Sequence, residues 1–233
     1  MTIRTKIYAA IVLTVLGPIA TTAVALHGMA QLGDRFDEVQ QRADAESLAR
    51  EIKFLVTDVN GWQTAYGYAG DDVTQRDALR RTYLRSEREL ADELEVASTT
   101  FIDPREEELL ARLEREFARF KDLDAIAWGA LEGGDPDRTR QILLGPELRL
   151  FRAMASTADE LAANETEQAE ATGAAFDDAR DDARRRLIAV ALGAGIVIVL
   201  LLFAANDIAR MALEGERRVR GQGSREPPGG DAE

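Results

Sequence analysis

The chain has 233 residues, of which 30% are charged and 6% aromatic, with 6 prolines and no cysteine. This composition, rich in Ala, Leu, Arg, Glu and Asp, favours long helices over sheet, and the lack of cysteine excludes disulfides and thiol chemistry. The net charge of −13 argues against a nucleic-acid partner, because phosphate binding requires clustered Lys and Arg.

The first expected element is an apolar stretch, residues 7–33, that contains no Asp, Glu, Lys or Arg. A transmembrane helix needs about 20 apolar residues, so we predict one over 7–29, after a cytoplasmic N-terminus of residues 1–6. A signal peptide cleaved near Ala23-Val24-Ala25 is the alternative. We favour the uncleaved anchor, because the apolar run is long and a helical seam follows it at once.

Residues 30–186 are predicted to form an all-α, up-down-up-down four-helix bundle. The first helix should continue to about residue 69, because seam residues step by three and four along it. These residues are Ala45, Leu48, Ile52, Leu55, Val59, Trp62, Tyr66 and Ala69. Gly70-Asp71-Asp72 is expected to break this helix, and Thr74 with Asp77 to form a capping box for the second.

The third helix should begin at Asp103-Pro104, with Asp103 as N-cap and Glu106 at the third helical position, and should end at Gly133-Gly134. A short helix is then expected from Asp135-Pro136 to about residue 144, where Gly145-Pro146 should break it. Each of these boundaries depends on proline or glycine chemistry.

The fourth long helix is predicted to continue into a second charge-free stretch, which forms transmembrane helix 187–206. The tail, 207–233, contains five arginines and then a Gly- and Pro-rich end, so we expect a basic segment on the anionic membrane lipid followed by disorder. Arg4, Lys6 and this tail place both termini in the cytoplasm and the bundle outside the cell membrane. Arg184-Arg185-Arg186 oppose this orientation, but a long domain is translocated largely regardless of charge.

The segment from Lys53 to Tyr68 reads KFLVTDVNGWQTAYGY. With the helical plan over residues 1–206, it resembles the four-helix-bundle sensor region of bacterial methyl-accepting chemotaxis receptors. The resemblance implies a sensory input module that detects an extracytoplasmic small molecule or partner and moves one membrane helix. Such receptors continue into a HAMP linker and a cytoplasmic signalling domain. With 27 residues after Asn206, we expect both to be lacking, and signalling to pass through a full-length receptor or a kinase complex.

Aromatic faces and amide donors near the end of the first helix suit a small polar ligand. The candidate ligand-binding residues are Asp58, Asn60, Trp62, Gln63, Tyr66 and Asp124. A packed seam with solvated flanks is the simpler interpretation of the residues on the first helix. Asp124 stands where the third seam expects an apolar residue, and we expect the seam to shift to Leu123. Glu165 raises the same question on the fourth helix, where small neighbours should admit water.

No cofactor, metal site or catalytic residue is expected, and we predict that the chain is not an enzyme. His27 is the single histidine, whereas metal centres need several convergent ligands. The run Glu106-Glu107-Glu108 lies at a helix start, where negative charge suits the helix dipole.

Small residues on the fourth helix favour a parallel homodimer, because two lone helices near the membrane bury little surface. These residues are Ala169, Ala175, Ala179 and Ala183. The competing hypothesis is a structural or adaptor protein that uses the bundle as a spacer or docking surface.

Overall fold

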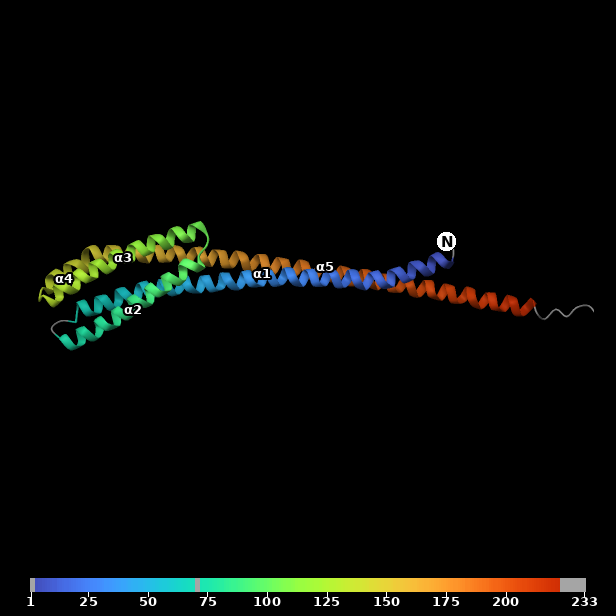
Figure 1. Ribbon diagram of the computed structural model, residues 1–233, viewed down its shortest axis with the longest axis horizontal. Helices are drawn as coiled ribbons and strands as arrows, with labels where there is room; N and C mark the ends of the chain where they lie inside the picture. Colours follow the sequence, from blue (N-terminus) through green and yellow to red (C-terminus); the bar gives the residue numbers. More distant parts are fainter. Residues whose placement is uncertain (1–2, 70–71, 223–233) are drawn as a thin grey trace, which may run out of the picture. The chain divides into compact units, whose positions relative to one another are not determined.

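The computed structural model describes residues 3–69 and 72–222 (Figure 1). This part of the chain is all-α, which confirms the predicted fold class. Its elements are α1 (Ile3–Gly67), α2 (Val73–Thr100), α3 (Pro104–Glu132), α4 (Pro136–Ile142), the π-helical turn η1 (Leu143–Glu147) and α5 (Leu148–Gln222).

The chain divides into two units, and the unit Arg35–Phe176 contains the four-helix bundle. One continuous apolar core runs along the bundle, and the long helices each contribute to it: fully buried examples are Ile52 from α1, Leu90 from α2, Leu113 from α3 and Leu161 from α5. The seam positions predicted at steps of three and four therefore face inward, as an amphipathic helix requires.

Helix α2 begins one residue after Asp72, whose side chain accepts a hydrogen bond from the backbone N–H of Gln75 at 3.0 Å. The expected capping box of Thr74 and Asp77 is therefore wrong, because both residues already lie inside the helix. Asp72 precedes the first helical residue, where a short acidic side chain satisfies an unpaired N–H. Gly70 and Asp71, the rest of the expected break, lie outside the described residues.

Helix α3 begins as predicted. The Asp103 side chain accepts from the backbone N–H of Arg105 at 2.8 Å, and the Glu106 carboxylate accepts from the N–H of Asp103 at 3.1 Å. This reciprocal pair is a capping box. At the other end Gly133 caps the helix and Gly134 has φ +77°, a conformation that favours glycine.

The expected break at Gly145-Pro146 is wrong. The chain passes from α4 through the π-helical turn η1, which contains Pro146, and continues into α5. Proline has no N–H to donate to the carbonyl one α-helical turn earlier, and its ring clashes with that carbonyl. A wider π turn moves this carbonyl away from the ring, so the chain remains helical. Helix α4 is held against α3 by the Thr139 hydroxyl, which donates to the carbonyl of Ala127 at 3.2 Å.

The other unit comprises Met1–Asp34 and Asp177–Glu233. It contains the two charge-free stretches, and α1 and α5 are each long and apolar enough to cross a membrane. Large apolar side chains on both stretches are exposed, among them Leu26, Leu192 and Phe203, as expected of surfaces that contact lipid. His27 lies 3.2 Å from Gln31, one turn further along α1.

Candidate functional site

A buried polar cluster lies at the end of the bundle where α1 ends and α2 begins. We call it the distal cluster, and it consists of Gln63, Tyr66, Arg80, Asp124 and Glu147. Residues of α1, α2, α3 and η1 therefore meet at one point. Asp124 is 2% exposed and Gln63 and Glu147 are each 1% exposed, so the cluster is shielded from solvent.

Asp124 is the hub of the distal cluster. Its carboxylate accepts from Nη1 of Arg80, at 2.8 Å to Oδ1 and 2.6 Å to Oδ2, and from Nε2 of Gln63 at 3.1 Å. The hydroxyl of Tyr66 donates to the same carboxylate, and Gln63 also donates to Glu147. The expected shift of the seam to Leu123 is wrong, because Leu123 is only half-buried while Arg80 offsets the charge of the buried Asp124.

Arg80 is held by aromatic rings as well as by charge. Its guanidinium carbon lies 4.5 Å from the ring centroid of Tyr83, 4.9 Å from that of Trp128 and 5.1 Å from that of Tyr66. These are cation–π distances, which strengthen as a site is desolvated. The ring of Tyr66 also meets those of Tyr83 and Trp128 edge to face. Arg80 therefore has little freedom to leave Asp124.

Burial sets the protonation states of the distal cluster. It raises the pKa of Glu147 to about 8, with the negative charge of Asp124 acting in the same direction. Burial also raises the pKa of Tyr66, again helped by Asp124. Burial opposes the charge of Arg80, but Asp124 outweighs it and raises the Arg80 pKa. At pH 7 the cluster accordingly contains one ion pair, Arg80 with Asp124, and a mostly neutral Glu147.

The other sequence candidates lie outside the distal cluster. Asp58 accepts from Nε1 of Trp62 at 3.0 Å and from the hydroxyl of Ser86, which joins α1 to α2. Asn60 is half-buried on α1. The structure thus brings three of the six candidates together, Gln63, Tyr66 and Asp124.

Sequence reasoning missed Arg80 and Glu147. A buried Asp124 on the third seam would require a positively charged partner. Arg80 lies one turn before the seam residue Tyr83 on the second helix, so the sequence offered it as a candidate partner. Glu147 directly follows Gly145-Pro146, where we expected the helix to break. Without a continuous helix, its side chain could not be assigned to a face by periodicity.

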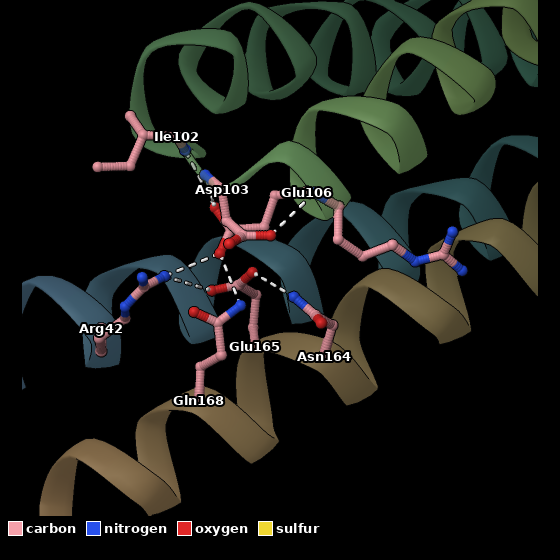
Figure 2. Close-up of polar contacts among 8 residues, drawn as sticks. Arg42, Ile102, Asp103, Glu106, Asn164, Glu165 and Gln168 are labelled. Carbon is pink, nitrogen blue, oxygen red and sulfur yellow. Dashed lines mark hydrogen bonds and ion pairs between the residues drawn. The ribbon is translucent and has the colours of Figure 1, made fainter.

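A second buried cluster lies near the turn between α2 and α3, at the opposite end of the bundle. We call it the carboxyl pair, Glu106 of α3 and Glu165 of α5, with Arg42 of α1 between them (Figure 2). Nη1 of Arg42 lies 2.8 Å from Oε1 of Glu106 and 3.8 Å from Oε2 of Glu165. Gln168 donates to Glu106 at 2.8 Å, and Asn164 donates to Oε1 of Glu165 at 3.4 Å.

Glu165 is fully buried, so the expectation that water reaches it through small neighbours is wrong. Its Oε2 atom is buried without a hydrogen-bond partner. Burial raises the pKa of Glu165 to about 7, and Glu106 adds to the rise through its charge and by accepting a hydrogen bond from the protonated carboxyl. For Glu106 burial acts upward too, but the backbone N–H groups of the cap and Arg42 lower its pKa below the usual range.

These arrangements hold helices together through buried charge and contain no nucleophile or metal centre that we can identify. Among the residues that the structure describes, no group of three or more His, Cys, Asp and Glu side chains is placed to hold a metal ion. Both clusters can respond to a change in charge. The gain or loss of one proton, or the binding of a charged ligand, would leave a buried charge without a counter-charge.

Comparison with protein families identifies a match over most of the chain. Residues 1–178 match the family model described as a four helix bundle sensory module for signal transduction. No curated protein and no solved structure matches the chain significantly. The match covers both the bundle and the first apolar stretch, and it agrees with the resemblance carried by the segment from Lys53 to Tyr68. The chain therefore belongs to the family of four helix bundle sensory modules for signal transduction.

Proposed function

We propose that the protein is a membrane-anchored input module that detects an extracytoplasmic small molecule or partner and transmits a helix displacement across the membrane. The observation that carries this proposal is the buried Arg80–Asp124 ion pair, which joins α2 to α3 beside Gln63, Tyr66 and Glu147. A buried ion pair adds little net stability to a fold. If one partner is withdrawn, however, the other is left as an uncompensated buried charge, which is strongly destabilising. A ligand that engaged either partner would therefore shift this contact.

The proposed mechanism begins at the distal cluster. A polar ligand that engaged Arg80 or Asp124 would compete with their mutual contact and change how η1 packs through Glu147. Glu147 is the last residue of η1, and α5 begins at the next residue. The ligand would bias the position of α5 only if it bound the two arrangements unequally. A shift of about 1 to 2 Å is typical of such switches.

The membrane arrangement and the assembly are part of the proposal. Transmembrane helices 7–29 and 187–206 would place residues 30–186 outside the cell membrane and both termini in the cytoplasm. A parallel homodimer packed along the small residues of α5 would complete the membrane-proximal part. Output would pass through a receptor or kinase complex. Ligand contacts would come from Asp58, Asn60, Trp62, Gln63, Tyr66 and Asp124, with Arg80 added.

An adaptor role is the second candidate, and one feature favours it. Asp124 is already satisfied by three donors without any ligand, as expected of a static fastening between helices. A sensor and an adaptor differ in one property, because only the sensor has a ligand that stabilises it.

Thermal unfolding of the full chain in lipid nanodiscs, with and without single amino acids and small dicarboxylates, tests the proposal. A ligand present at 100 times its Kd should stabilise the bundle by about 2.7 kcal/mol. Gln63→Ala should reduce the shift, since a lost hydrogen bond to a bound polar group weakens binding by about 1 to 3 kcal/mol. Gln141→Ala, at an exposed position of α4, is the matched control and should keep it. A panel without any shift would favour the adaptor.

A further inference from the structure

The carboxyl pair presents a charge imbalance that the proposed ligand site does not use. Two fully buried carboxyl groups, Glu106 and Glu165, face one guanidinium, that of Arg42 (Figure 2). Arg42 donates a hydrogen bond to Glu106 at 2.8 Å but lies 3.8 Å from Glu165. Its positive charge therefore compensates mainly the Glu106 carboxylate. With both carboxyls ionised, Glu165 would be a buried anion without its own counter-charge, which is strongly unfavourable.

The hydrogen-bond partners of the two carboxyl groups indicate which of them would hold a proton more readily. Glu106 is saturated with donors: the backbone N–H groups of Ile102 and Asp103, Arg42 and Gln168. Four donors favour the ionised form of that carboxylate. Glu165 accepts one long bond from Asn164 on Oε1, and its Oε2 is buried without an acceptor or donor. A hydroxyl at Oε2 would be satisfied by donating to Glu106.

The surroundings leave few other charges to compensate. Among charged groups, the largest effects on Glu165 come from Glu106 of α3 and Arg42 of α1. Glu46, one turn beyond Arg42, pairs with Arg50 and accepts from Thr166. Arg105, beside the cap of α3, pairs outward with Glu108 and with Glu160. The cations Arg50 and Arg105 are therefore already paired and are not available to offset a negative charge on Glu165.

We propose that Glu165 is a proton-binding site, and that its proton holds α5 against the start of α3 through a hydrogen bond to Glu106. Loss of the proton places two buried carboxylates beside one arginine, and α5 relaxes away from α3 at this end of the bundle. The bundle thereby responds to external pH. This inference deepens the proposed function by naming a signal, and it acts at a cluster separate from the ligand candidates.

Infrared difference spectroscopy of the full chain in nanodiscs tests the protonation directly. Buried Glu147, whose pKa is about 8, would titrate in the same range, so the experiment uses the Glu147→Gln chain as its parent. Between pH 5.5 and pH 8.5 the spectrum of this chain should lose a carboxylic-acid C=O band with a midpoint near pH 7, the pKa of Glu165 being about 7. Glu165→Gln should remove that band, while Glu170→Gln, at an exposed position of the same helix, should keep it. A band that persists when Glu165→Gln is added to the Glu147→Gln chain, or the absence of a band in the Glu147→Gln chain itself, would overturn the assignment.

Spin labels test the movement. The parent chain has no cysteine, so single cysteines at Glu114 of α3 and Ala171 of α5, both exposed, report one helix-to-helix distance. The distance distribution should change between pH 5.5 and pH 8.5 in the parent chain and stay at its acidic form in Glu165→Gln. An identical response in both would overturn the switch. Ligand-dependent thermal shifts at fixed pH are read separately, so failure here leaves the proposed function standing.

Discussion

Asp124 carries a negative charge on the inward face of α3, and the distal cluster tolerates it because Arg80 supplies the opposite charge at 2.6 Å. The rings of Tyr66, Tyr83 and Trp128 then cover the guanidinium. The inward position of Tyr66 could be predicted from its place in a three–four seam. The pairing could not, because Arg80 is a long side chain on the flank of its helix, and its direction depends on a partner from another helix.

Removal of Arg80 should leave Asp124 as an unpaired buried charge. Arg80→Met is expected to lower the free energy of unfolding of the bundle by about 3 to 5 kcal/mol. Arg80→Met with Asp124→Asn should recover most of this loss, since no charge remains. Denaturant unfolding of the full chain in detergent micelles measures both. A double variant as unstable as the single one would contradict the ion-pair account.

Glu147 should make stability depend on pH in a defined direction. Its pKa in the folded state is about 8, whereas the usual pKa of a glutamate side chain is 4.5, so the folded state holds the proton more tightly. The stabilising contribution of Glu147 to the free energy of unfolding is complete below pH 4.5 and is lost as the pH rises toward 8. Glu147→Gln keeps an acceptor for Gln63 and should flatten this part of the profile, as thermal unfolding at a series of pH values would show. Glu132→Gln, at an exposed site, is the control and should retain the parent slope.

At the scale of elements, caps and turns show which sequence signals are sufficient. Asp103, Pro104 and Glu106 specify the start of α3 locally, because the capping box needs no residue from elsewhere. Gly145-Pro146 looks like a break for the same local reasons, yet the chain remains helical through η1. There the outcome depends on tertiary contacts, among them the buried Ile142, Leu143 and Glu147, which keep the turn in place against the bundle.

Two glycines of α1 make a matched pair that tests the packing at the end of this helix. A Cβ at Gly61 would meet nothing within 4 Å, so Gly61→Ala should stabilise the helix by about 0.5 to 1 kcal/mol. A Cβ at Gly67 would lie 2.2 Å from Cδ1 of Leu143, so Leu143 must move. Gly67→Ala should therefore stabilise the bundle less than Gly61→Ala, because moving the Leu143 methyl group offsets part of the gain in helix propensity. Thermal unfolding compares the two, and equal stabilisation would show that η1 is loosely packed.

At the scale of the whole molecule, the long apolar stretches and the acidic bundle between them could be recognised from sequence, because length and charge are properties of the chain alone. The two apolar stretches lie in α1 and α5, the helices that are long and apolar enough to span a membrane. Dimer formation depends on contacts between two copies of the chain. The spacing of small residues along one helix indicates such contacts only indirectly. The homodimer therefore stays a prediction.

Single cysteines along the small-residue stretch of α5 test that dimer in native membranes. If parallel copies pack there, oxidation should cross-link the substituted positions with a helical period of about 3.6 residues. The positions of interest include Ala169, Ala175, Ala179 and Ala183. A flat profile along the stretch would count against this packing.

An input to the bundle is expected to displace α5 relative to α1. The most direct measurement is the distance between spin labels at Ser47 of α1 and Glu167 of α5, both exposed, in the full chain in nanodiscs. It is taken before and after addition of the compound that gives the largest thermal shift. We expect a change of about 1 to 2 Å, and at the same ligand concentration a smaller fraction of the Gln63→Ala chain should show it. An unchanged distance in the ligand-saturated parent protein would contradict it.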